Sequence, residues 1–187
     1  MKDAIAVKEQ EQHEMNAECS IWLLPEAAQE EELRKTIAEL SPLLGEPPFA
    51  PHVTIQGDLS WSAEDLDGSL TRLATMLPLQ RWRVKDVECS EHFFRCLYLR
   101  FVDQPAFPTM QEFAKNLSRT VVGLSPFPHL SLAYGSADDE TRRLRDGLAR
   151  TFAGQEIVFD RIAVCRSSKD VPIDKWQVLR EYRFSGK

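Results

Sequence analysis

The sequence has no long hydrophobic run. None of its uninterrupted apolar stretches is longer than five residues, whereas an α-helix needs about 20 to cross a bilayer. The first 17 residues are polar and lack the apolar segment of a secretory signal. We therefore predict a cytoplasmic protein without membrane contact, in which residues 1–17 form a flexible polar leader and the fold begins near residue 18.

Cysteine is scarce and never closely paired. The four cysteines are far apart and include no Cys-x-x-Cys motif, the spacing that metal sites and redox motifs use. This spacing favours reduced, mostly buried thiols, and the residues concerned are Cys19, Cys89, Cys96 and Cys165.

Basic residues are outnumbered. There are 23 Lys and Arg against 29 Asp and Glu, which gives a formal net charge of −6. A groove that grips a long nucleic acid depends on clustered Lys and Arg, so this balance argues against one. A small anionic ligand needs only a few hydrogen-bond donors and stays possible.

The chain has the size and composition of an ordinary globular protein. Its 187 residues are 43% hydrophobic and 28% charged, which suits one domain or two small lobes that share a core. Apolar residues at helical spacing predict helices over residues 25–45, 62–77, 105–121 and 136–154. Alternating or short apolar runs predict strands over residues 19–24, 50–59, 81–90, 94–102, 128–135, 156–167 and 175–184.

The predicted elements form an internal repeat. After the first strand, the order is helix, histidine-containing strand, helix and two strands, and the same series then follows again. We interpret residues 18–187 as one bilobal domain whose approximate halves are residues 25–103 and 104–187. Two such halves related by a pseudo-twofold axis would place their histidine strands side by side.

Histidine is also rare, yet two of the four copies share one setting. "PHVTIQG" at residues 51–57 and "PHLSLAYG" at residues 128–135 each place a histidine two residues before a hydroxyl. Side chains at i and i+2 of a strand share a face, so His52 points with Thr54 and His129 with Ser131. We expect the other two, in the leader (His13) and in a turn (His92), to be surface residues.

Two imidazoles and two hydroxyls suit the opening of a cyclic phosphodiester. Imidazole titrates near pH 6.5, so one histidine can take a proton from water while the other protonates the leaving oxygen. The hydroxyls can donate to non-bridging phosphate oxygens as charge builds up. We expect neither a metal nor another cofactor. The two histidines are interchangeable at this stage.

The paired motifs resemble those of the 2H phosphoesterase superfamily, and the match extends to the cyclic phosphodiesterase family known from plants and yeast. "SIWLLP", "FFRCLYL", "PHLSLAYG" and "RIAVCRSSKD" followed by "KW" look like strands of that family, over about residues 19–184. The resemblance implies an α+β fold with two antiparallel sheets that face a central cleft and helices outside. It also implies hydrolysis of ADP-ribose 1″,2″-cyclic phosphate and of nucleoside 2′,3′-cyclic phosphates.

The resemblance carries roles to individual residues. It implies that His52 and His129 are the acid and base, and that Thr54 and Ser131 are phosphate donors. Further residues that the resemblance places at the substrate are Tyr134, Trp22 and Phe94, none with an obvious counterpart in the other half. Tyr134 would contact the phosphate, whereas Trp22 and Phe94 would hold a base or ring, or else simply pack in the core.

Basic residues outside the motifs leave substrate preference open. Arg95 is a departure from the family pattern, and Arg166 and Lys169 lie in the last loop, where they either reach an anionic ligand or form a solvated turn. A small nucleotide or ADP-ribose cyclic phosphate is the first hypothesis for the substrate. An enzyme acting on RNA ends, of the 2′-5′ RNA ligase-like kind, and a non-catalytic nucleotide-binding module are the alternatives. We expect a monomer, although the sequence does not fix the oligomeric state.

Overall fold

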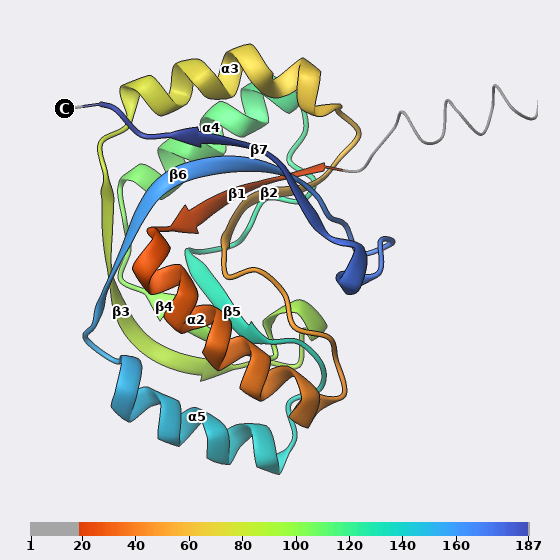
Figure 1. The fold of residues 1–187 in the computed structure, drawn as a ribbon, viewed down its shortest axis with the longest axis vertical. Helices are drawn as coiled ribbons and strands as arrows, with labels where there is room; N and C mark the ends of the chain where they lie inside the picture. Colours follow the sequence, from red (N-terminus) through yellow and green to blue (C-terminus); the bar gives the residue numbers. More distant parts are fainter. Residues whose placement is uncertain (1–18, 187) are drawn as a thin grey trace, which may run out of the picture.

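Figure 1 shows the computed structural model, which describes residues 19–186. The predicted leader lies outside these residues. Every predicted helix and strand is confirmed. The helices are α2 (Ala27–Leu40), α3 (Ala63–Met76), α4 (Ala106–Ser118) and α5 (Asp139–Phe152). The strands are β1 (Cys19–Pro25), β2 (Val53–Leu59), β3 (Gln80–Cys89), β4 (Leu97–Phe101), β5 (His129–Ala133), β6 (Glu156–Arg166) and β7 (Gln177–Arg183).

Helix α3 illustrates how local sequence sets an element. Ser62 accepts a hydrogen bond from the backbone N–H of Asp65, whose carboxylate in turn accepts from the backbone N–H of Ser62. This capping box satisfies N–H groups that the first turn leaves without a partner. Leu66, Leu70 and Leu73 then recur on the buried face. The helix therefore begins and orients as its sequence pattern predicts.

The strands form one antiparallel sheet in the order β2-β1-β6-β3-β4-β5, with β7 paired to β6. Exchanging β1 with β4, β2 with β5 and β3 with β6 gives the same strand order read from the opposite edge of the sheet. The pseudo-twofold axis therefore passes between β3 and β6. The two antiparallel sheets expected from the sequence are the two ends of this sheet. The repeating unit is thus βαβαβ, and the boundary between halves moves from residues 103/104 to the connection between β3 and β4.

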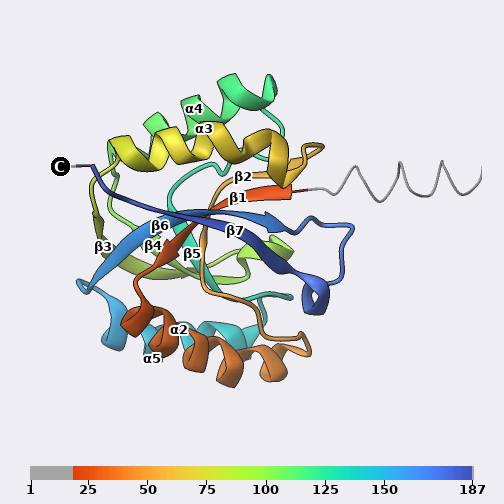
Figure 2. The ribbon, with the colours of Figure 1, turned by 45° about the horizontal axis from the view of Figure 1, so that its top comes forward.

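Helices cover the sheet across the repeat. Figures 1 and 2 show α3 and α4 on one side of the molecule and α2 and α5 on the other. Helix α2 packs against β5 and α4 against β2, while α5 packs against β3 and α3 against β6. Each lobe therefore takes strands and helices from both halves of the chain, which fixes the two histidine strands relative to each other.

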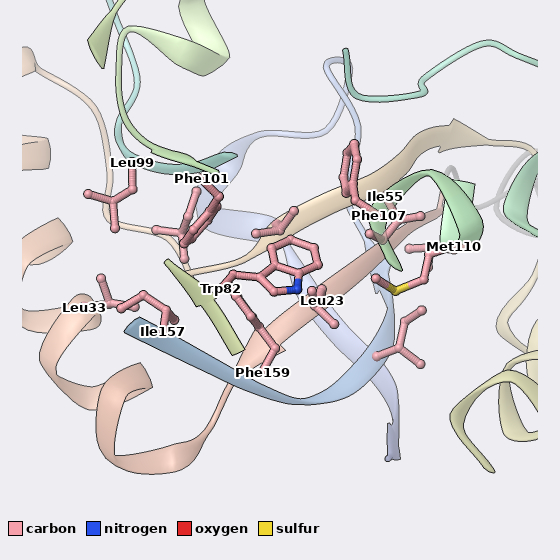
Figure 3. Close-up of a cluster of buried hydrophobic side chains, with 14 of the residues drawn as sticks. Leu23, Leu33, Ile55, Trp82, Leu99, Phe101, Phe107, Met110, Ile157 and Phe159 are labelled. Atoms are coloured by element: carbon pink, nitrogen blue, oxygen red, sulfur yellow. The ribbon is translucent and has the colours of Figure 1, made fainter. Parts of the chain in front are cut away.

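Aromatic side chains fill the core beside the axis (Figure 3). The Trp82 ring on β3 lies with its centroid 5.0 Å from that of Phe159 on β6 and 5.7 Å from that of Phe101 on β4. Phe107 of α4 meets the same indole edge-on at 6.0 Å. These large buried rings join the two lobes where their sheets meet, since aromatic residues bury much apolar area and prefer tilted contacts.

The cysteines match their prediction. All four are free thiols, and three are buried while Cys89 is half-buried. Burial raises the pKa of Cys19 and of Cys96 to about 11, which keeps both thiols protonated and poorly nucleophilic at neutral pH. Within residues 19–186, the helices are all too short or too polar to span a membrane.

Candidate active site

The two histidine strands meet at one cavity of about 240 Å³. Its lining includes Thr54 of β2 and His52 just before that strand, and His129 and Ser131 from β5. Val53 and Leu130, which alternate with them, are fully buried in the core. The structure thus brings together the four side chains that the sequence pattern placed on two equivalent faces.

Both imidazoles are held in the same way by their own backbone. Nδ1 of His52 lies 2.6 Å from the carbonyl oxygen of Ala50, and Nδ1 of His129 lies 3.0 Å from that of Phe127. A carbonyl oxygen can only accept, so Nδ1 carries the hydrogen in each ring. Nε2 is then the basic nitrogen of each neutral imidazole, on the ring edge turned away from this carbonyl.

The environment of both histidines opposes their protonation. His52 is 6% exposed and His129 is 8% exposed. Burial lowers the pKa of each from 6.5 to about 4, although the carbonyl contact at Nδ1 acts in the opposite direction. The positive charges of Arg95 and Arg100 further lower the pKa of His129. The pKa of His52 is further lowered by the charge of His129. Without a ligand, both rings are neutral at pH 7.

Each imidazole rests against an aromatic ring on the neighbouring strand. The Trp22 indole stacks on His52 with a centroid distance of 3.7 Å and an interplanar angle of 9°. Tyr98 meets His129 edge-on at 5.5 Å. Trp22 pairs with Thr54 across β1 and β2, as Tyr98 pairs with Ser131 across β4 and β5. Trp22 therefore has a counterpart in the other half, which the sequence did not reveal.

The stack changes how Trp22 can meet a ligand. It lines the cavity but is only 2% exposed, and His52 covers one face of its indole. This stacked geometry suits a residue that supports the imidazole ring of His52. The prediction that it holds the ring of a substrate stays a prediction.

Aromatic residues from three loops form another wall of the cavity. Phe94 is half-buried and lies 5.3 Å from Tyr134 and 5.9 Å from Trp176, centroid to centroid. Tyr134 is 2% exposed, stacks on Phe49 at 3.9 Å, and has its pKa raised by burial. A hydroxyl with such a pKa stays protonated and remains a donor. Trp176 belongs to the "KW" pair of the last hairpin, and the sequence predicted no role for it at the site.

The hydroxyls of the two motifs differ in their present partners. Ser131 Oγ donates to the carbonyl oxygen of Phe94 at 2.8 Å. Thr54 Oγ1 has no such bond to another residue of the range 19–186. Ser131 must therefore turn away from Phe94 before it can donate to a ligand, whereas Thr54 is ready.

A model of the family described as "Cyclic phosphodiesterase-like protein" matches residues 15–184. The chain belongs to this family. The cyclic phosphodiesterase of Arabidopsis thaliana is 24% identical over 165 residues, which cover 86% of this chain and 91% of the relative. Family membership places the protein among phosphodiesterase hydrolases.

Solved structures show the same fold. TT0787 of Thermus thermophilus has a TM-score of 0.59 at 16% identity and covers 91% of this chain and 99% of its own. The phosphate complex of Escherichia coli LigT has a TM-score of 0.55 at 16% identity and covers 90% of this chain and 98% of its own. With the family match, these structures place this cyclic phosphodiesterase-like protein in the 2H phosphoesterase superfamily.

Two glycines close one side of the cavity of this cyclic phosphodiesterase-like protein. The N–H of Gly57 donates to the carbonyl oxygen of Gly123 at 2.8 Å, so the segment before β5 adds to the edge of β2. The Gln56 side chain secures it by donating to the carbonyl oxygens of Thr120 and Val122, at 3.1 and 2.8 Å. Sequence reasoning missed this wall, because it depends on a contact between distant segments.

The rim of the cavity carries basic side chains from both loops. His92 and Arg95 come from the connection between β3 and β4, and Lys169 comes from the connection between β6 and β7. His92, which we expected at the surface, is exposed but borders the cavity. Arg166 is exposed and lies outside the cavity lining. Across residues 19–186, no three His, Cys, Asp or Glu side chains gather as a metal-binding group.

Proposed function

We propose that this protein hydrolyses a nucleoside or ADP-ribose cyclic phosphate to a monophosphate, by acid–base catalysis that needs no metal ion. The observation that carries the proposal is the matched pair of buried imidazoles. Each is fixed through Nδ1 to its own backbone, and both line one small cavity. Held in this way, two imidazoles can serve as a base and an acid on opposite sides of one phosphorus atom.

The environments of the two rings support a division of roles between them. Arg95 and Arg100 disfavour a positive charge on His129 and thus keep its Nε2 unprotonated, so that it can accept a proton. The proton that the anionic substrate attracts into the cavity therefore settles on His52. His129 takes a proton from water, whose oxygen bonds to phosphorus. The bond from phosphorus to one ribose oxygen breaks, and His52 Nε2 gives its proton to that oxygen.

The hydroxyls complete the site. Thr54 and Ser131 donate to the two non-bridging oxygens, and Tyr134 is a further donor nearby. Such donors act most strongly in a site shielded from water. Solved complexes of the structural neighbour LigT with phosphate and with 3′-AMP fit a monophosphate product.

The first test is turnover of 2′,3′-cyclic AMP in the presence of EDTA. Wild-type activity should be unaffected by the chelator, and His52→Ala and His129→Ala should each lower kcat by about 10²- to 10⁴-fold. An exposed residue at the rim, His92, supplies the control variant His92→Ala, which should stay close to wild type in thermal stability. Activity that survives both of the first two substitutions would refute the site.

A second substrate separates acid from base. A p-nitrophenyl phosphodiester has a leaving group that departs without a proton, so loss of the general acid should matter little for it. His52→Ala should therefore lose much less activity on this ester than on cyclic AMP, whereas His129→Ala should lose activity on both. The reverse pattern would exchange the two roles.

A further inference from the structure

Arg95 stands at the mouth of the cavity as a cation without an anionic partner. It is half-buried, lines the cavity, and has no carboxylate within 4.0 Å among residues 19–186. Many other arginines of the chain are neutralised by neighbours, such as Arg142 by Asp139 and Arg180 by Asp67. A half-buried guanidinium left unpaired beside a cavity is a binding group for an anion.

The position of Arg95 is fixed rather than free. The backbone N–H of Arg95 donates to the carbonyl oxygen of His92 at 2.8 Å, and the backbone carbonyl oxygen of Arg95 accepts from Ser90 Oγ at 2.6 Å. The guanidinium carbon lies 5.2 Å from the centroid of the Phe127 ring, in cation–π contact. A donor group held in this way loses less conformational entropy when it binds a ligand.

The Phe127 ring also connects Arg95 with the histidine side of the cavity. The same ring has its centroid 5.3 Å from that of His129, so it is in contact with both the guanidinium and the imidazole. His52, His129, Thr54 and Ser131 already provide the groups that the cyclic phosphate needs. Arg95 lines the same cavity from another loop, which suits an anionic group at the other end of the same sugar.

We propose that Arg95 binds a phosphate on the 5-oxygen of the ribose that carries the cyclic phosphate. This proposal rests on the proposed function and names the feature by which the enzyme chooses among cyclic phosphates. A planar guanidinium can hold two phosphate oxygens at once, which a lysine in its place would not do. A nucleotide 5′-phosphate, the diphosphate of ADP-ribose and the last phosphodiester of an RNA end all present this group.

The decisive measurement compares two substrates that differ only in that phosphate: adenosine 2′,3′-cyclic phosphate with and without a 5′-phosphate. Wild-type kcat/KM should be higher for the 5′-phosphorylated substrate, mainly through a lower KM, since a remote group binds ground state and transition state alike. Arg95→Gln should reduce this preference by about 10- to 100-fold, the range for a charge-assisted hydrogen bond. Arg95→Lys should restore only part of it.

Arg72→Gln, at an exposed position of α3, is the matched control and should keep the wild-type preference. Equal losses on both substrates in Arg95→Gln would overturn the proposal, because Arg95 would then act on the reaction itself. A wild-type enzyme with no preference would also overturn it.

Two further experiments complete the test. One identifies the natural source of the phosphate, and the other decides the proposal if the protein shows no turnover. An ADP-ribose cyclic phosphate and a dinucleotide ending in a 2′,3′-cyclic phosphate, each assayed with wild type and Arg95→Gln, show which natural form gains most from Arg95. If the wild-type protein turns over no cyclic phosphate, titration calorimetry can still test the proposal. It measures the affinity of wild type and of Arg95→Gln for adenosine 2′,5′-bisphosphate and for 2′-AMP. Selective weakening of the bisphosphate in Arg95→Gln would support this subsite even though the proposed function had failed.

Discussion

Acidification should destabilise this protein chiefly through its two buried histidines. Each has a pKa of about 4 in the folded chain, against 6.5 for an unperturbed histidine. Between these values the unfolded chain binds protons that the folded chain does not, so the free energy of unfolding falls as the pH falls. This stabilising contribution is complete above pH 6.5 and is lost by about pH 4. A shift of this size corresponds to about 3 kcal/mol per histidine.

Two such contributions are large beside the roughly 5 to 15 kcal/mol that stabilises a typical domain. The assay is urea denaturation at several pH values between 7 and 4.5, with wild type and the double variant His52→Gln/His129→Gln. Glutamine does not titrate, so the double variant should lose several kcal/mol less than wild type over this interval. Carboxylates that titrate in the same interval are common to both proteins and cancel in the difference.

A matched control is His92→Gln, because this histidine is exposed at the rim. It should follow the wild-type pH dependence much more closely than the double variant does. If the difference in unfolding free energy between wild type and the double variant does not change between pH 7 and pH 4.5, both imidazoles titrate normally. An anionic substrate would then not be needed to bring the catalytic proton into the cavity.

Three further predictions concern two supports of the site and one glycine of α3. Gly123→Ala places a Cβ 1.9 Å from the carbonyl oxygen of Gly57, at a φ of 74°, so it should destabilise the fold by about 1 to 3 kcal/mol and lower activity. Gly68→Ala, in open space within α3, should instead stabilise by about 0.5 to 1 kcal/mol, and denaturation curves measure both. Tyr98→Phe keeps the ring beside His129 but removes the 2.7 Å bond to Glu88, so we expect it to lose about 1 kcal/mol of stability with a small change in kcat. A loss of kcat as large as that of a histidine variant would contradict a supporting role.

The local parts of this fold were readable from the sequence. Apolar spacing predicted each helix and strand, and the capping box at Ser62 shows how local sequence sets the start of α3. The repeated histidine motif predicted that His52 and Thr54 share a face, because side chains alternate along any strand. Periodicity of this kind depends only on backbone geometry within a few residues.

The pairing of strands and the electrostatics of the site needed the tertiary structure. Local patterns placed β4 at the end of the first half, whereas hydrogen bonding makes it the partner of β5 and the counterpart of β1. That pairing sets Tyr98 beside His129 as Trp22 is set beside His52. Other tertiary contacts bring Gly123 onto β2 and Arg95 onto Phe127.

The sequence by itself therefore determined which side chains share a strand face, and the tertiary structure decided how each of them behaves. An imidazole's type and strand face are set by its neighbours along the chain. Its pKa depends instead on burial and on charges brought close from distant segments, as Arg95 and Arg100 are for His129. Desolvation and Coulomb interactions act through space, so no spacing of residues along the chain encodes them.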